Sequence, residues 1–181
     1  LNLIKKMGFV PKDGTNDTFY KKYDKCGNYI IEVDFKNEKI NFGKHIVLES
    51  KATINFSQKE NWVVLECVDR LLEKGYNPKL ITLEKTWATG HGTSGRLDIL
   101  VKRKDGSSYL MIECKTWGVE FDKELKKINR DGGQLFTYFQ QDTKADVLML
   151  YSSMLDGKEI KFRNEIINIE PDYREAGNVK D

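Results

Sequence analysis

The chain has 181 residues, of which 39% are hydrophobic and 32% are charged, and its formal net charge is +2. This balance is typical of a globular protein, and the length allows one domain with a real core plus an appendage. No apolar run approaches the roughly 20 residues that a bilayer-spanning helix needs, so we expect no membrane partner. The net charge is too small to argue for nucleic acid. Basic clusters at 102–104 and 123–130 either face phosphates or form solvated surface.

The cysteines predict the redox state of the protein. Cys26, Cys67 and Cys114 are odd in number and widely spaced, and no pair has the spacing of zinc ligands. We therefore expect free thiols in a reduced, cytoplasmic protein, and the sequence shows no signal peptide.

Residues 1–50 are predicted to form a β-rich extension. The segment 29–35 alternates between apolar and polar residues, and after a short turn the chain continues as 40–43, which predicts a β-hairpin. An earlier strand at 19–23 is expected to pair with it. The acidic residues of the hairpin are interpreted as its solvated face.

An amphipathic helix is predicted after residue 57. Ser57 and Glu60 have the spacing of a capping box, in which each side chain bonds to the backbone N–H of the other residue. Apolar residues then recur with the helical period, and Gly75 ends the helix. A strand is expected near 80–86. The glycine-rich loop 89–96 that follows is interpreted as a mobile linker, with phosphate binding by its backbone or by His91 as the alternative.

The most informative feature is a pair of apolar runs, at 97–101 and 109–115, because charged residues stand inside them. An Asp-Gly turn separates the runs, which predicts an antiparallel hairpin. Burying an unpaired charge is costly, so Asp98, Glu113 and Lys115 need a reason to be there. Alternate residues of a strand share a face, which puts Glu113 and Lys115 together. Two carboxylates and one ammonium predict a site for Mg²⁺ or Mn²⁺ beside an anionic substrate.

Two helices are predicted downstream of the hairpin. Charged residues at 122–130 indicate an exposed helix, which a break at 131–133 separates from a second helix at 134–141. Gln134 and Tyr138 are four residues apart and share a face of this second helix. The remaining elements are expected to be a buried strand at 145–151, one or two strands within 158–169 and a polar tail at 171–181.

Four elements in this order closely resemble the PD-(D/E)XK nuclease superfamily: Asp98, the hairpin, Glu113-x-Lys115 and Gln134-x-x-x-Tyr138. Leu97 stands where the proline of the name would be. The resemblance covers residues 57–153 and is greatest to the nuclease domain of type I restriction enzyme R (motor) subunits and related restriction-modification proteins. It implies an α/β fold whose restriction-endonuclease-like core, at 51–170, has a mixed central sheet of four or five strands flanked by helices.

The resemblance also implies roles for the residues of the hairpin. Asp98, Glu113 and the backbone carbonyl of Cys114 would hold the metal ion, whereas the Cys114 side chain belongs to the core. Lys115 would orient the attacking water or stabilise the charge that develops on phosphate.

Residues outside the hairpin would complete the site. A carboxylate from the preceding helix or strand is expected near the metal, and Glu60, Glu66 and Glu84 are candidates, with Glu60 favoured. Gln134 would position the lysine or the substrate backbone, and Tyr138 would stack on or hydrogen-bond to nucleic acid.

The predicted function is that of a metal-dependent DNA endonuclease domain of a restriction-modification enzyme. The expected partners are DNA and further domains or subunits, namely a helicase motor or a methyltransferase and a specificity subunit. The alternative is a module of the same fold that binds nucleic acid without cutting it or docks other subunits. The intact Asp98, Glu113 and Lys115 argue for cleavage.

Overall fold

The two apolar runs form the centre of the larger sheet in the computed structural model, which describes residues 1–89, 92–93 and 95–171. Strands β9 (Leu97–Lys102) and β10 (Ser108–Cys114) pair antiparallel across the Asp-Gly turn, as predicted. Nearly all their residues are buried, because strands flank them on both edges and helices cover both faces.

Four further strands extend this hairpin into a six-stranded sheet in the order β12-β11-β10-β9-β6-β5. Strand β11 runs parallel to β10 and β5 runs parallel to β6, whereas the other neighbours are antiparallel. The mixed sheet is as predicted, but within the described residues it has six strands instead of four or five. The four strands that extend the hairpin are β5 (Val47–Leu48), β6 (Ile81–Lys85), β11 (Val147–Asp156) and β12 (Glu159–Asn168).

The N-terminal part of the chain forms a second sheet, which is antiparallel and has the order β1-β2-β3-β4. The predicted hairpin is β3 and β4, and the predicted earlier strand is β2, which pairs with β3. Buried residues of β3 alternate with its acidic ones, so the acidic side chains lie on the outward face. The elements here are α1 (Asn2–Lys6), β1 (Val10–Pro11), β2 (Thr18–Tyr23), the 3-10 helix η1 (Asp24–Cys26), β3 (Tyr29–Asp34) and β4 (Lys39–Asn41).

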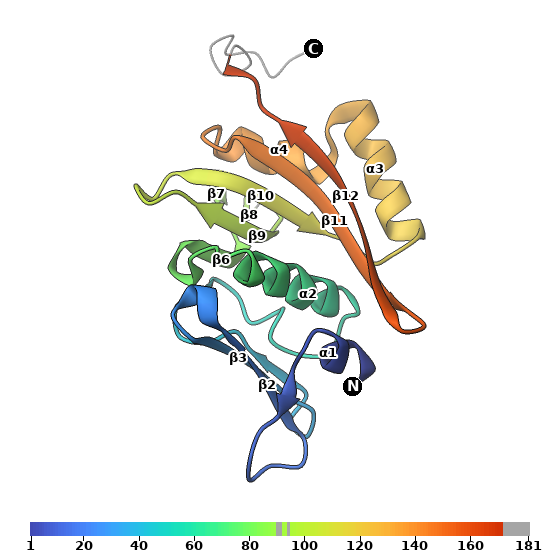
Figure 1. The fold of residues 1–181 in the computed structure, drawn as a ribbon. Helices are drawn as coiled ribbons and strands as arrows, with labels where there is room; N and C mark the ends of the chain where they lie inside the picture. Colours follow the sequence, from blue (N-terminus) through green and yellow to red (C-terminus); the bar gives the residue numbers. More distant parts are fainter. Residues whose placement is uncertain (90–91, 94, 172–181) are drawn as a thin grey trace.

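Helices separate and cover the sheets (Figure 1). Helix α2 (Glu60–Glu73) lies between the two sheets, and one apolar cluster joins the N-terminal sheet, α2 and one face of the larger sheet. Helices α3 (Val119–Asp131) and α4 (Gly133–Gln141) cover the opposite face with a second cluster. The chain is thus a mixed α/β protein, as predicted. The division of the chain at residue 50 stays a prediction, and β5 contributes one strand from before it to the larger sheet.

The start of α2 corrects the sequence analysis, because the predicted capping box does not form. The helix begins at Glu60 without a side-chain cap, and the Ser57 hydroxyl and backbone N–H both bond to Asn55 Oδ1 instead. Glu60 is therefore released from the structural role that the capping box assigned to it. The predicted end is confirmed, since Gly75 has a φ of 89° and its N–H donates to the Leu72 carbonyl at 2.9 Å.

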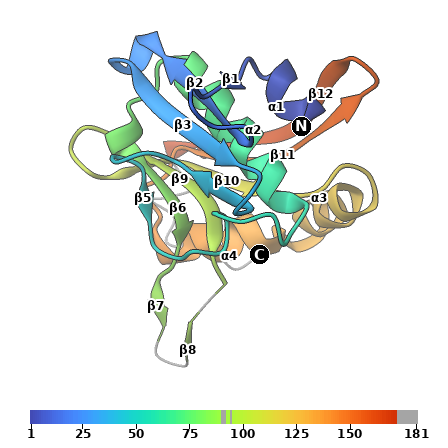
Figure 2. The same cartoon turned by 90° about the horizontal axis from the view of Figure 1, so that it is seen from below.

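Between β6 and β9 the chain forms a small hairpin instead of the predicted loop. Strands β7 (Ala88–Thr89) and β8 (Gly92–Thr93) pair antiparallel and project from the larger sheet (Figure 2). His91 and most of the polar tail, residues 172–181, lie outside the described residues. Before β6 a 3-10 helix, η2 (Pro78–Leu80), follows α2.

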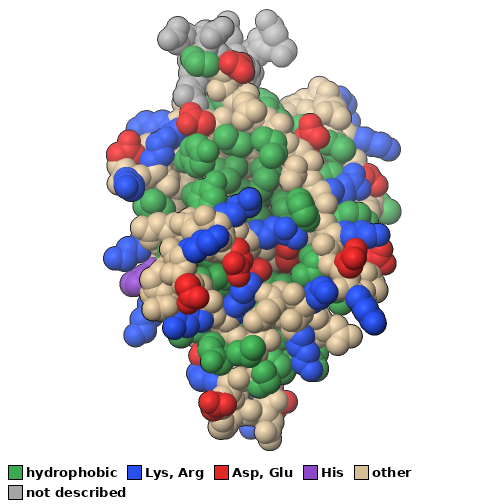
Figure 3. Space-filling view, viewed as in Figure 1, with side chains coloured by type: hydrophobic (Ala, Val, Ile, Leu, Met, Phe, Trp, Pro, Cys, Tyr) green, Lys and Arg blue, Asp and Glu red, His purple; other side chains and the backbone are tan. Residues whose placement is uncertain are grey.

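Apolar side chains also reach the surface on the face that Figure 3 shows. A groove of about 430 Å³ lies between α2 and the larger sheet, and Phe162 and Ile166 of β12 are about half exposed along it. None of the helices in the described ranges has the length and apolar character to cross a membrane. All three cysteines are free, as predicted.

Candidate active site

Asp98 and Glu113 face each other where the hydrogen-bonded ladder between β9 and β10 ends. The register pairs Met111 with Leu100 and Ile112 with Ile99, so the next residues that stand opposite are Glu113 and Asp98. Opposite residues of neighbouring strands point to the same face. Asp98 Oδ2 accepts a hydrogen bond of 2.7 Å from the backbone N–H of Cys114, and thus replaces a carbonyl of the ladder.

Lys115 joins these carboxylates on the same face, as the strand alternation predicts. Its ammonium donates to Glu113 Oε1 at 2.5 Å. Glu113 is only 2% exposed, and its other oxygen, Oε2, has no hydrogen-bond partner among the described residues. An acceptor that is buried and unsatisfied is costly and usually marks a missing ion, water or substrate.

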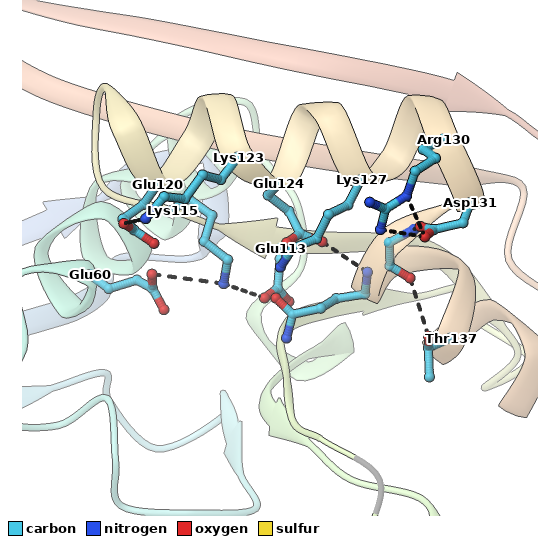
Figure 4. Close-up of polar contacts among 12 residues, drawn as sticks. Glu60, Glu113, Lys115, Glu120, Lys123, Glu124, Lys127, Arg130, Asp131 and Thr137 are labelled. Carbon is cyan, nitrogen blue, oxygen red and sulfur yellow. Dashed lines mark hydrogen bonds and ion pairs between the residues drawn. The ribbon is translucent and has the colours of Figure 1, made fainter.

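Glu60 is the helix carboxylate nearest to this cluster (Figure 4). It lies on the first turn of α2, and its Oε2 is 3.8 Å from Lys115 Nζ, so the ammonium lies between Glu60 and Glu113. The competing candidate Glu66 is bound elsewhere, because its carboxylate pairs with Arg70 and accepts from the Tyr151 hydroxyl.

Glu84 lies on the other side of Asp98. The pairing of β6 with β9 places it opposite Asp98, between the paired residues Leu83 and Lys85. Its backbone is in the left-handed region with a φ of 56°, which is strained for a residue with a side chain. Its carboxylate forms an ion pair of 2.9 Å with Arg96. Strain of this kind is often found at functional sites.

The carboxylates of the site have raised pKa values, chiefly because they are buried. Burial raises the pKa of Asp98 well above its usual range, and the nearby charge of Glu113 adds to this. Burial likewise raises the pKa of Glu113, to about 7, although Lys115 opposes it. Burial also raises the pKa of Glu60. Burial lowers the pKa of Lys115, but Glu113 and Glu60 outweigh this effect and hold it above its ordinary value.

Gln134 and Tyr138 of α4 border the same cluster. Burial raises the pKa of Tyr138, and the charges of Glu113 and Asp98 raise it further. The hydroxyl donates to the backbone carbonyl of Arg96 at 3.0 Å. Tyr138 therefore holds the segment that leads into β9.

The predicted contact of Tyr138 with nucleic acid is not supported by its position. Its ring is only 2% exposed and stacks against Trp87, with the ring centroids 5.9 Å apart. These contacts give Tyr138 a structural role, and its contact with nucleic acid stays a prediction.

Glu124 is a residue of this region that the sequence analysis missed. It lies on α3, which was predicted to be exposed, yet it is 2% exposed and its charge acts on Glu113. The spacing of Phe121, Glu124 and Ile128, the buried residues of α3, could have identified it, because positions three and four apart share a helix face.

The site fits a hard divalent cation by its chemistry. Asp98 and Glu113 provide carboxylate oxygens, and Glu113 Oε2 is an acceptor without a donor in the described structure. Within the described ranges no three His, Cys, Asp or Glu side chains are grouped to share an ion. Two carboxylates suit Mg²⁺, which keeps several waters and is commonly bound by one or two carboxylates together with substrate phosphates.

Comparison of the sequence with known protein families gives one match. Residues 59–154 match the model described as Type I restriction enzyme R protein N terminus (HSDR_N), which is more than half of the chain. The matched region runs from just before α2 into β11 and includes the whole candidate site. No curated protein matches the chain.

Proposed function

The chain belongs to the family of the type I restriction enzyme R protein N terminus (HSDR_N), and we propose that it is a metal-dependent DNA endonuclease domain with a PD-(D/E)XK active site. The observation that carries the proposal is the end of the β9–β10 ladder. Two buried carboxylates face each other there, and a lysine and an unsatisfied oxygen of Glu113 lie on the same face.

The order of the elements supports a restriction-endonuclease-like core. A helix, a strand, the hairpin with Asp98 and Glu113, a helical connection and a parallel strand follow one another. The central sheet is mixed, and helices lie on both of its faces. This arrangement agrees with the superfamily that the motif resembles.

Asp98 and Glu113 would hold Mg²⁺ or Mn²⁺, with the carbonyl of Cys114 and the carboxylate of Glu60 as further donors. When bound, such an ion activates water and neutralises negative charge on phosphate. The Lys115 ammonium, which neighbours Glu113 and Glu60, is suited to stabilise the charge of the attacked phosphate or to orient the water. Tyr138 would keep the start of β9, and thus Asp98, in place.

The family also indicates a context of restriction and modification. We propose that DNA reaches the site through further parts of the enzyme, such as a motor or a specificity subunit. Cleavage fits the site better than a binding-only module, because binding alone would not need two carboxylates, Asp98 and Glu113, to be buried together beside Lys115 at high electrostatic cost.

A plasmid assay tests the proposal. The protein is incubated with supercoiled DNA and Mg²⁺ or Mn²⁺ from low to physiological salt, beside Glu113→Gln and the control Asp105→Asn, which changes an exposed carboxylate of the same hairpin. The parent and the control should nick DNA at low salt and only weakly at physiological salt. Glu113→Gln should not nick DNA at any salt concentration. Equal cleavage by Glu113→Gln, or none by the parent with either metal at any salt, would contradict the proposal.

A further inference from the structure

Glu124 differs from the other acidic residues of α3 in its burial. The side chains of Glu120, Asp122 and Asp131 are each more than half exposed, whereas that of Glu124 is 2% exposed. The other charged side chains of this helix lie on its exposed surface, whereas the Glu124 carboxylate points toward the interior of the protein. Burial of a carboxylate requires partners that compensate for the lost water.

Both oxygens of Glu124 have such a partner (Figure 4). Oε1 accepts a hydrogen bond of 2.9 Å from the backbone N–H of Gln134, and Oε2 accepts one of 3.1 Å from Lys127 Nζ. Gln134 is the second residue of α4, so its N–H is one of those that the helix itself cannot satisfy. Glu124 therefore caps α4 from a neighbouring helix, since the N-cap residue Gly132 has no side chain to do so. Asp131, at the end of α3, adds a weaker cap, because its Oδ1 accepts from the Gly133 N–H at 3.2 Å.

The chain between the helices is shaped around this carboxylate. A Cβ atom on Gly133 would lie 2.7 Å from Glu124 Oε1, which is too close for a real contact. Gly132 and Gly133 also have positive φ angles, of 86° and 57°. Glycine suits position 133 because it adopts this backbone without strain and has no Cβ atom to collide with Glu124.

The capped end of α4 leads to the candidate active site. Tyr138 lies one turn after Gln134, and its hydroxyl holds the Arg96 carbonyl two residues before Asp98. A shift in the start of α4 would thus move Gln134 and the Tyr138 hydroxyl together, and with them the segment that carries Asp98.

We propose that Glu124 is a positioning residue of the nuclease site, which through the backbone N–H of Gln134 fixes where α4 begins and so sets Gln134 and Tyr138 beside Asp98 and Glu113. The effect on catalysis rests on the proposed function, whereas the effect on α4 does not. The hydrogen bond, and not the negative charge, is the part of Glu124 that this role needs.

Three variants separate the hydrogen bond from the charge and from helix stability. Glu124→Gln keeps an oxygen that accepts from Gln134, and Glu124→Leu removes it. Glu120→Leu is the matched control, because Glu120 pairs with Lys123 with the same i,i+3 spacing as Glu124 with Lys127 but is exposed. Gly133→Ala is a fourth variant, which displaces the carboxylate while leaving it in the chain.

The first readout is hydrogen exchange at the Gln134 amide by NMR, which needs neither metal nor activity. Exchange should be slow in the parent, Glu124→Gln and Glu120→Leu, and at least about tenfold faster in Glu124→Leu and Gly133→Ala, because the amide loses its acceptor. If the Gln134 amide exchanged as slowly in Glu124→Leu and Gly133→Ala as it does in the parent, the proposal would be overturned. If Glu124→Leu does not fold, Glu124→Ala, which also removes the acceptor but adds no bulk, decides this point.

The second readout is the kinetics of Mn²⁺-dependent cleavage of DNA. Glu124→Leu should lower kcat on the order of 100-fold with little change in KM, since misplacement of a catalytic group has effects of this size. Glu124→Gln and Glu120→Leu should stay within about threefold of the parent. A Glu124→Gln variant as slow as Glu124→Leu would show that the charge matters, and would overturn the positioning role. If the parent itself does not cut, the proposed function fails, and the exchange experiment still tests the role of Glu124.

Discussion

Lys21 and Lys115 are both half-buried among carboxylates, and their surroundings differ. Lys21 lies at the contact of the N-terminal sheet with α2, where its ammonium reaches the Met7 carbonyl at 2.6 Å, Asp69 at 2.7 Å and Glu73 at 2.8 Å. The Tyr23 hydroxyl donates a further bond of 2.7 Å to Asp69. Three partners match the three N–H donors of the lysine.

Lys115 has a less complete environment. One carboxylate oxygen of Glu113 lies 2.5 Å from its ammonium, but Glu60 is 3.8 Å away, beyond hydrogen-bond distance. Glu113 Oε2 has no donor in the described structure, and Asp98 adds a further negative charge. Unlike the Lys21 cluster, this cluster thus contains a buried carboxylate oxygen that no donor of the described residues reaches.

The comparison distinguishes a structural charge cluster from a functional one. A buried network in which every group is paired holds its elements in register, whereas a partly satisfied one is destabilising unless another group completes it. The Lys21 cluster is complete within the chain. We infer that the cluster of Lys115 is completed by a metal ion and a phosphate, and four predictions test this difference.

The largest effect is expected for Asp98→Asn. The amide oxygen can still accept from the Cys114 N–H, but the charge that would bind the metal is gone. Cleavage should be abolished, while the metal-free variant should unfold at no lower temperature than the parent, because two carboxylates that repel each other become one. A loss of more than about 2 kcal/mol in the free energy of unfolding would instead assign Asp98 a structural role.

Lys115→Met is expected to slow cleavage strongly and to leave metal binding intact. The lysine acts on water or phosphate in this account and is not a ligand. Calorimetry with Mn²⁺ should show an unchanged or modestly higher affinity, since a competing cation has left Glu113. Cleavage near the parental rate would contradict the role of Lys115, and loss of Mn²⁺ binding would show that it holds the site together.

Lys21→Met should show the opposite behaviour. It leaves the buried carboxylate of Asp69 without its cation and should lower the free energy of unfolding by about 3–5 kcal/mol, as measured by urea denaturation. Below the new melting temperature, metal affinity should not change. The matched control is Lys12→Met, whose more exposed pair with Glu32 should contribute less than about 1 kcal/mol. Equal effects of the two variants would remove the distinction between the clusters.

The smallest effect concerns pH. The folded pKa of Glu113 is about 7, above that of an unfolded glutamate, so its proton stabilises the metal-free fold. This contribution is fully present below the unfolded pKa and is lost as the pH rises through about 7. Thermal unfolding from pH 5 to 8 should thus show a decline in the parent that is weaker in Glu113→Gln. Mn²⁺ should reduce the decline, because it binds the charged form. An identical decline in Glu113→Gln would refute this assignment.

The sequence predicted the centre of the site because the signal is local. Charged residues inside two apolar runs identify Asp98, Glu113 and Lys115, and strand alternation puts the last two on one face. The hairpin followed from the same pattern, and the mixed sheet was expected from the resemblance to the nuclease superfamily. Strand β5, at two residues, is too short to show alternation, and β12 was expected only as one or two strands of uncertain extent.

The errors concern contacts that the spacing of residue types does not show. The capping box failed because the helix begins at Glu60 with Lys59 at its N-cap, while the Ser57 hydroxyl and N–H bond to Asn55 Oδ1. Glu124 was overlooked because the many charges of α3 were interpreted as an exposed helix, although the spacing of its buried residues was visible in the sequence. Its bond to the backbone N–H of Gln134 depends on how α4 meets α3. The sequence already favoured Glu60 over Glu66, and the bonds of Glu66 to Arg70 and Tyr151 strengthen that preference.

The central claim is that Asp98 and Glu113 are completed by a divalent cation. Its most direct test is a calorimetric titration of the parent protein with Mn²⁺ at neutral pH, beside Asp98→Asn, Glu113→Gln and the control Asp105→Asn. The account predicts one binding event in the parent and the control, with release of protons from the carboxylates of raised pKa, and none in the two site variants. Equal binding in all four proteins, or no binding in the parent, would contradict it.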